Sequence, residues 1–172
     1  MPFKRGSSRD DLRDSGARAR VSSSLRSLDA FSFWVVPSRE ANRDDLIVVG
    51  TTGTFLVMPC ALGGALMFGA AGPSVGSASV PDLRGLKRRA KALRSTLNAA
   101  AVFSSVEPVV CFTHAVSGPP RTVRGVRYLH VKDLARDLSS RPSSLPRGRA
   151  QRAARTLGMH IAGDEGRHFS AR

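Results

Sequence analysis

The feature that most constrains this chain is a pair of short apolar runs between residues 45 and 58. Residues 46–49 (Leu-Ile-Val-Val) form the first run, and residues 55–58 (Phe-Leu-Val-Met) form the second. Gly-Thr-Thr-Gly at residues 50–53 separates them. Short β-branched or aromatic runs bounded by glycine are typical of strands joined by a tight turn. The segment therefore predicts a β-hairpin.

Helical and strand-like segments alternate on either side of this hairpin. The spacing of apolar residues predicts helices, and short apolar runs predict strands. In chain order we expect a helix at 17–28, a strand at 31–36, the hairpin, a helix at 82–99, strands at 106–113 and 126–131, and a helix at 132–138. Residues 61–80 are small and uncharged, which indicates a loop with one weak strand around 65–68. This order predicts an α/β fold with one mixed sheet covered by helices.

The helix expected at residues 82–99 has an apolar face and a basic face. Asp82 stands at its start, where a carboxylate can cap the first turn. The apolar positions, spaced by three or four residues, are Leu86, Ala90, Leu93 and Leu97. The basic positions that we expect to face solvent together are Arg84, Lys87, Arg88, Lys91 and Arg94. These five are the candidate nucleic-acid-binding residues.

The composition divides the chain into one domain and two flanking segments. Residues 1–16 are polar and charged, and we expect a flexible arm there. Residues 17–139 hold the expected α/β domain. Residues 140–172 are rich in Ser, Pro and Arg, which predicts a basic tail with at most one short helix at 149–157.

The charge of the chain favours a polyanionic partner. The net charge is +14, and residues 83–139 hold eleven basic and three acidic side chains. Such a charge favours DNA or RNA, or an anionic membrane surface, whereas a composition bias toward arginine is the alternative explanation. No motif indicates a small-molecule substrate.

Two cysteines and an uncharged central stretch bear on location. Cys60 and Cys111 lack the spacing of a zinc site or a disulfide framework, so we expect reduced, buried thiols, no metal and a cytoplasmic protein. No secretory signal is expected from the polar first residues.

Residues 48–71 carry no charge, and their insertion into a membrane is an alternative. Glycines, threonines and a proline interrupt that stretch, which favours a hairpin followed by a loop.

The hairpin, the basic helix and the next strand together resemble the nuclease-related domain (NERD) family of the restriction-endonuclease-like superfamily. In that family an Asp opens the hairpin, and its second strand ends in an acid-x-lysine triplet. A basic helix and a strand like Glu-Pro-Val-Val-Cys-Phe-Thr at residues 107–113 follow. The resemblance covers roughly residues 16–138. It implies a restriction-endonuclease-like mixed sheet flanked by helices.

The departures from the family pattern fall on its catalytic residues. Asp45 keeps the type of the first acid, whereas Met58 and Cys60 stand at the positions of the family's acid and lysine. Leu46 replaces the usual His, and Gly85 replaces the helix Gln. The resemblance therefore implies a pseudoenzyme with a vestigial Asp45 and no confident catalytic residue.

Metal-dependent cleavage of a phosphodiester needs carboxylates for Mg²⁺ and a cation for the developing charge. A thioether is a poor ligand for a hard cation, and a thiol supplies no positive charge. We therefore expect a DNA- or RNA-binding module without hydrolysis and without a cofactor. An active nuclease remains the alternative, with Mg²⁺ held by Asp44, Asp45 or Glu107.

Overall fold

The computed structural model describes residues 8–37, 45–70 and 72–168, with side chains from residue 16 to residue 158 within these ranges. Over this part of the chain it contains four helices: α1 (Ser8–Leu25), α2 (Leu83–Ala99), α3 (Val131–Ser139) and α4 (Arg147–His168). The first strands are β1 (Phe33–Pro37), β2 (Leu46–Gly50), β3 (Gly53–Cys60), β4 (Gly64–Gly69), β5 (Gly72–Val75) and β6 (Ala78–Ser79). The later strands are β7 (Val106–Phe112), β8 (Val116–Ser117), β9 (Arg121–Val123) and β10 (Val126–His130).

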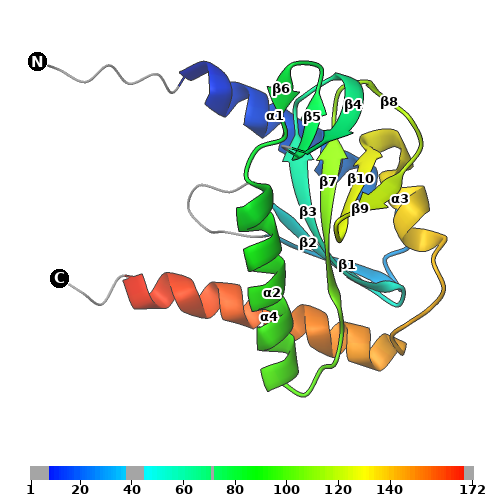
Figure 1. Cartoon of the computed structure of the whole chain (residues 1–172). Helices are drawn as coiled ribbons and strands as arrows, with labels where there is room; N and C mark the ends of the chain where they lie inside the picture. The colour runs from blue at the N-terminus through cyan, green and yellow to red at the C-terminus, as the bar shows by residue number, and fades with distance from the viewer. Residues whose placement is uncertain (1–7, 38–44, 71, 169–172) are drawn as a thin grey trace, which may run out of the picture.

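The central sheet is mixed and, among the described residues, has six strands in the order β1-β2-β3-β7-β10-β9. The hairpin expected at residues 45–58 is its centre, because β2 and β3 pair antiparallel with Leu46 opposite Val57. Strand β7 pairs parallel with β3, and β10 pairs parallel with β7. The crossover that a parallel neighbour needs contains α2 between β3 and β7, whereas β8 and β9 lie between β7 and β10. The α/β fold with helices covering a mixed sheet is confirmed as a single domain (Figure 1).

Alternation along the strands gives the sheet two apolar faces. One face carries Ile47, Leu56 and Val110, and it packs against α2 and α4. The other carries Val48, Phe55 and Val109, and it packs against α1 and α3. Adjacent residues of a strand therefore belong to different layers of the molecule. Two polar side chains of the sheet can therefore meet only if they lie on the same face.

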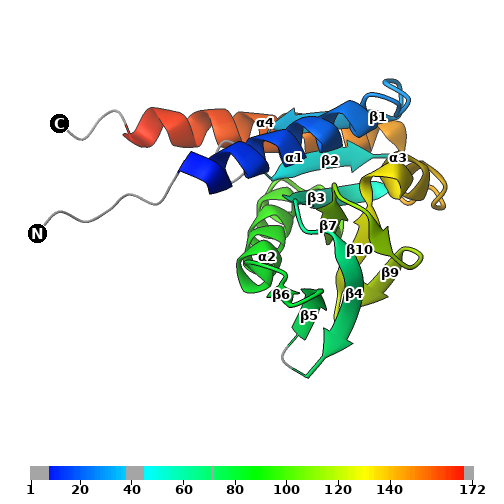
Figure 2. The ribbon, with the colours of Figure 1, turned by 90° about the horizontal axis from the view of Figure 1, so that it is seen from above.

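The segment expected as a loop at residues 61–80 forms part of a second, smaller sheet. Its weak strand at 65–68 is confirmed as β4, which continues into β5 and β6 and pairs with β8 in the order β6-β5-β4-β8. Figure 2 shows this small sheet on the side of the molecule away from α1 and α4. The described residues of 48–71, the membrane alternative, thus lie in strands and their turns. Among the described residues no helix is long and apolar enough to cross a bilayer.

Helix α1 begins earlier than the apolar spacing predicted. It starts at Ser8, inside the segment 1–16 that we expected as a flexible arm, while residues 1–7 lie outside the described residues. Residues 8–11 (Ser-Arg-Asp-Asp) contribute nothing to an apolar pattern, so the spacing could not reveal this start. The apolar spacing finds only the part of the helix that packs, at Ala17, Val21 and Leu25.

The C-terminal segment differs from the expected basic tail. Helix α4 runs from Arg147 to His168 and packs against β1 and β2, so it belongs to the domain. Before it, the backbone amides of Ser144 and Leu145 both donate to the carbonyl of Thr51, at 2.8 Å each. The buried residues of α4 are Ala150, Ala153, Ala154 and Leu157. Alanines among arginines bury a helix face without giving the segment an apolar composition.

Candidate nucleic-acid interface

Asp45, the expected vestigial acid, is buried and bound to an arginine of α2. The Nε and Nη2 atoms of Arg89 each lie 2.6 Å from the Oδ2 atom of Asp45. Arg89 stands one position beyond Arg88, on the side of the helix that faces the sheet, and its side chain is 10% exposed. Asp45 is therefore partnered by a guanidinium.

Asp82 joins the same group instead of capping α2 through its side chain as expected. It occupies the cap position with φ 49° and ψ 29°, and its side chain makes no capping hydrogen bond. Its Oδ2 atom accepts from Nη1 of Arg89 at 2.8 Å. Gly85 permits this arrangement, since a Cβ atom there would lie 2.1 Å from Oδ1 of Asp82. Arg89 thus binds the carboxylate that would otherwise cap the helix.

The two carboxylates keep Arg89 charged in a half-buried place. Burial favours the neutral form, but the hydrogen bonds and charges of Asp82 and Asp45 outweigh it and raise the pKa of Arg89. The cation is thus permanent at any physiological pH. It occupies the carboxylate that the nuclease alternative would need for Mg²⁺.

Met58 and Cys60 point to the same face of the sheet as this group. Leu46 is opposite Val57, so the next positions along the two strands are Asp45 and Met58. Met58 and Cys60 are buried in the apolar cluster under α2 and α4, and in the described residues Cys60 and Cys111 form no disulfide. Two carboxylates held by one arginine, a thioether and a thiol do not fit Mg²⁺, which requires several available oxygen ligands.

Glu107, a ligand of the nuclease alternative, lies on the other face of the sheet. It is opposite Phe55 in the register of β3 and β7, and Phe55 belongs to the cluster under α1 and α3. Its carboxylate is paired with Arg141. Asp44 lies outside the described residues. No group of three or more His, Cys, Asp or Glu suited to a metal ion is found within 8–37, 45–70 and 72–168.

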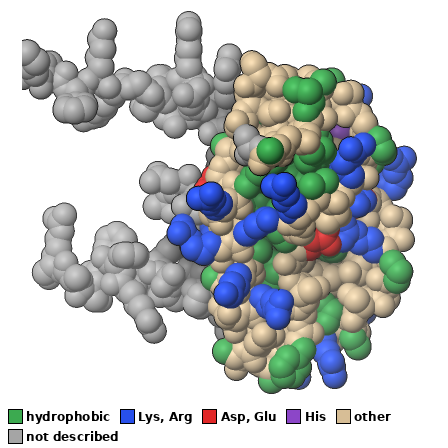
Figure 3. Space-filling view, viewed as in Figure 1, with side chains coloured by type: hydrophobic (Ala, Val, Ile, Leu, Met, Phe, Trp, Pro, Cys, Tyr) green, Lys and Arg blue, Asp and Glu red, His purple; other side chains and the backbone are tan. Residues whose placement is uncertain are grey.

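The basic residues expected on α2 are brought together on one exposed surface. Arg84, Lys87, Arg88, Lys91 and Arg94 are all exposed. We call these five residues the α2 basic surface. Figure 3 shows Lys and Arg side chains gathered on this side of the molecule, with few Asp or Glu side chains. In the described part of the chain, none of the five forms an ion pair with an acid.

Three arginines elsewhere in the domain, Arg127, Arg136 and Arg141, are paired with acids. Arg141 bridges Glu107 and Asp137, with its Nη2 atom 2.9 Å from Oδ2 of Asp137. Arg127 also pairs with Asp137, and Arg136 pairs with Asp133. The acids of the second half of the domain therefore lie away from the α2 basic surface. Positive potential therefore remains on α2 and also on α4, whose arginines at 147, 149, 152 and 155 are exposed and form no ion pair with an acid in the described residues.

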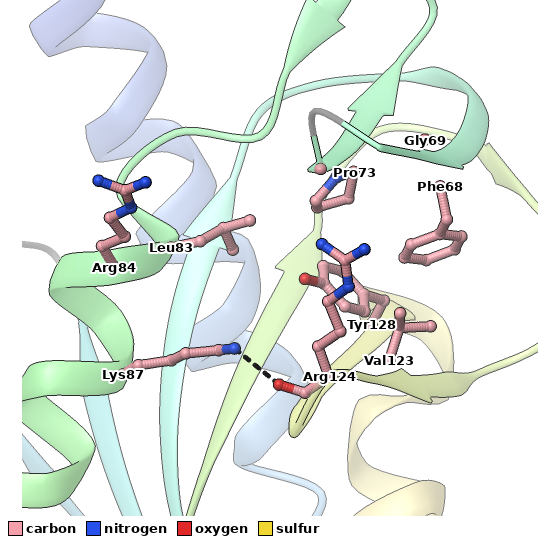
Figure 4. A pocket seen from close by; sticks show the side chains of 10 residues that line it. Phe68, Gly69, Pro73, Leu83, Arg84, Lys87, Val123, Arg124 and Tyr128 are labelled. Carbon is pink, nitrogen blue, oxygen red and sulfur yellow. Dashed lines mark hydrogen bonds between the residues drawn. The ribbon is translucent and has the colours of Figure 1, made fainter.

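A hollow that the sequence did not predict opens at the N-terminal end of the α2 basic surface. It has a volume of about 370 Å³ and lies between α2, the small sheet and the β9–β10 turn (Figure 4). Its apolar lining comes from Phe68, Pro73, Leu83, Val123 and Tyr128. Its charged lining is Arg84, Lys87 and Arg124. Three segments far apart in the sequence build it, so no local motif signals it.

The aromatic rings of this hollow are fixed by their neighbours. Phe68 and Tyr128 meet edge to face with ring centroids 5.1 Å apart. The guanidinium of Arg121 lies 5.6 Å from the Phe68 centroid, yet Arg121 does not line the hollow. Burial raises the pKa of Tyr128, which the charge of Arg124 opposes, so its hydroxyl stays protonated at neutral pH.

Comparison with known proteins identifies no family: no family model, no curated protein and no solved structure matches this chain.

Proposed function

We propose that this chain is a nucleic-acid-binding module built on a nuclease-like fold that has lost its catalytic residues. The observation that carries the proposal is the α2 basic surface, five exposed cations without an acidic partner in the described residues. Phosphate contacts from Lys and Arg supply most of the affinity of non-specific nucleic-acid binding. The other helix cation, Arg89, is held by acids and takes no part.

The fold supports the likeness to the nuclease-related domain only in the order and pairing of its strands and helices. The central hairpin, the basic crossover helix and the parallel β7 match the order expected from the family. Asp45 bound to Arg89 supports the view that such a fold serves here without chemistry. A surface that contacts phosphates without reading base edges binds without sequence preference.

Binding is tested with labelled DNA and RNA by fluorescence anisotropy at low salt, where we expect Kd values in the roughly micromolar range. The variant Arg88→Gln, Lys91→Gln, Arg94→Gln should weaken binding by at least about tenfold, because it removes three phosphate contacts. The matched control Arg26→Gln, Lys132→Gln, Arg136→Gln removes the same charge from the residue that follows α1 and from α3, on the opposite face. Equal losses in the two variants would assign the binding to net charge alone and reject the surface.

Hydrolysis is tested by incubating the protein with supercoiled and linear DNA plus Mg²⁺ or Mn²⁺. We expect intact DNA, because the carboxylates of Asp45 and Asp82 both pair with Arg89, and the described residues hold no group of three or more ligands suited to a metal ion. Cleavage that disappears in Asp45→Ala would show an active nuclease and reject the proposal of a module without chemistry.

A further inference from the structure

The hollow beside Phe68 and Tyr128 differs in chemistry from the rest of the α2 basic surface. Its floor is apolar and aromatic, while its rim carries three cations and, among the residues that line it, no acid. Its volume of about 370 Å³ lies near the lower end of the roughly 300–1,000 Å³ that small-molecule pockets occupy. Such a lining suits a flat aromatic group that carries an anionic substituent.

We infer that this hollow takes one unpaired nucleobase of a single-stranded nucleic acid, with the adjoining phosphate held by Arg84, Lys87 and Arg124. The inference rests on the proposed function and extends it, because it specifies single strands as the preferred substrate. Arg84 and Lys87 belong both to the α2 basic surface and to the hollow. A strand whose phosphates follow α2 therefore arrives at the hollow with a base available.

The aromatic floor supplies the attraction that phosphate contacts do not. Bases stack on aromatic side chains with little regard to sequence, because every base has a π-face. Phe68 is partly exposed and held by Tyr128 and Arg121, so it is ordered before a base arrives. In a duplex the bases are paired and stacked on one another, and none can enter. The hollow thus favours single strands over duplexes.

The backbone of Arg124 supports the same inference independently. Val123 and Val126 pair across a two-residue turn in which Arg124 has φ 50° and Gly125 has φ 75°. Positive φ at both turn positions favours Asn-Gly or Asp-Gly, whereas arginine is strained there. The Nζ atom of Lys87 donates to the carbonyl of Arg124 at 2.6 Å and holds the turn against α2 (Figure 4). Strained residues held by their neighbours are characteristic of binding sites.

The experiment compares two labelled strands of equal length and charge, using the full chain. One is an oligothymidine of about 12 nucleotides, within the usual site size of one binding domain, and the other is an abasic strand with the same phosphates. We expect the oligothymidine to bind about tenfold more tightly, the effect of one stacked base. In Phe68→Leu this ratio should approach one, while the affinity for the abasic strand stays unchanged.

Two further variants keep the test independent of folding defects. Arg124→Asn should weaken the binding of both labelled oligonucleotides. It should retain or raise the melting temperature of the protein, because Asn accepts a positive φ more readily than Arg. Met67→Leu is the matched control, since Met67 is 52% exposed and does not line the hollow. Its affinities should equal those of the unaltered protein.

The outcomes separate the two proposals. Equal affinity for the two strands, or a preference that survives in Phe68→Leu, would overturn the base-binding hollow while leaving phosphate binding by α2 intact. Failure of both strands to bind at low salt would reject the proposed function and the hollow with it.

Discussion

At the scale of single residues, Arg89 determines what the Asp45 position can do. A buried carboxylate beside a half-buried guanidinium is stable when both hydrogen bonds are made, and either partner alone is costly. Arg89→Met should therefore destabilise the fold by about 3 kcal/mol, as loss of one partner of a buried pair usually does. In urea denaturation this loss of stability should appear as a lower midpoint with an unchanged slope.

Arg88→Met is the control for this prediction. Arg88 is exposed and, in the described residues, has no acidic partner, so its replacement should change the unfolding free energy by no more than about 0.5 kcal/mol. If Arg89→Met were equally mild, the pair with Asp45 would not be a stabilising element of this fold.

Asp137 provides a residue-scale prediction about pH. Burial alone would raise the pKa of Asp137, but hydrogen bonds and charges from Arg127 and Arg141 outweigh it and lower the pKa below the ordinary 3.8. A carboxyl whose folded pKa is lowered stabilises the protein at higher pH, and this contribution is lost as the pH falls below 3.8. Asp137→Asn should cost about 1 kcal/mol at neutral pH, between the values of exposed and buried pairs.

The measurement is the melting temperature from pH 7 down to pH 2, with Asp133→Asn as the control. Asp133 pairs with Arg136, whose side chain is 76% exposed, so that change should cost less than Asp137→Asn. The difference between Asp137→Asn and the unaltered protein should shrink in acid. A difference that stays constant over the whole range would contradict the pKa assignment.

At the scale of elements, α4 shows that residues 147–158 are part of the core. Leu157 is fully buried against the sheet, so Leu157→Ala should destabilise the fold by about 2–5 kcal/mol. Gln151→Ala, on the exposed side of the same helix, should have little effect. Chemical denaturation compares the two, and equal, small effects would restore the description of this segment as a tail.

The elements that the sequence predicted correctly are those with a regular apolar pattern of their own. The β2–β3 hairpin, α2, β7 and α3 all fall where periodicity placed them. Helix α4 was underestimated because its buried face consists mainly of alanines among arginines. Most strands of the small sheet were missed because glycine and serine dominate them. These strands gain stability from pairing with partners distant in the sequence, which local propensity cannot reveal.

The candidate site was predictable to the same degree. The α2 basic surface follows from helical spacing, which places Arg84, Lys87 and Arg94 on one side of the helix. The pairing of Arg89 with Asp45 joins positions 44 residues apart and depends on how α2 crosses the sheet. The hollow likewise depends on how α2, the small sheet and the β9–β10 turn are placed around it. The charge of the α2 basic surface could therefore be predicted from the sequence, whereas the shape of the hollow depends on the tertiary structure.

At the scale of the whole molecule, the acids and bases are distributed unevenly. Residues 83–139 carry eleven basic and three acidic side chains, and those acids are bound to arginines away from α2. The exposed arginines of α4 add to the positive charge of α2 on the same side of the sheet. If the chain binds a polyanion as proposed, such a field would steer it toward the side of the sheet that α2 and α4 cover.

The salt dependence of binding reports how many of these charges contact phosphates. If about five do so on duplex DNA, a plot of log K against log salt should have a slope near −4 to −5, since each contact releases about 0.9 counterion. The variant Arg88→Gln, Lys91→Gln, Arg94→Gln should make the slope shallower by about 3, because each lost phosphate contact changes it by about 1. The control variant Arg26→Gln, Lys132→Gln, Arg136→Gln should keep the original slope. A flat slope, or a loss that is the same in both variants, would mean that the positive charge of this chain does not form a binding face. A shallower slope confined to the α2 variant would locate the contacts on that helix, since the two proteins have the same net charge.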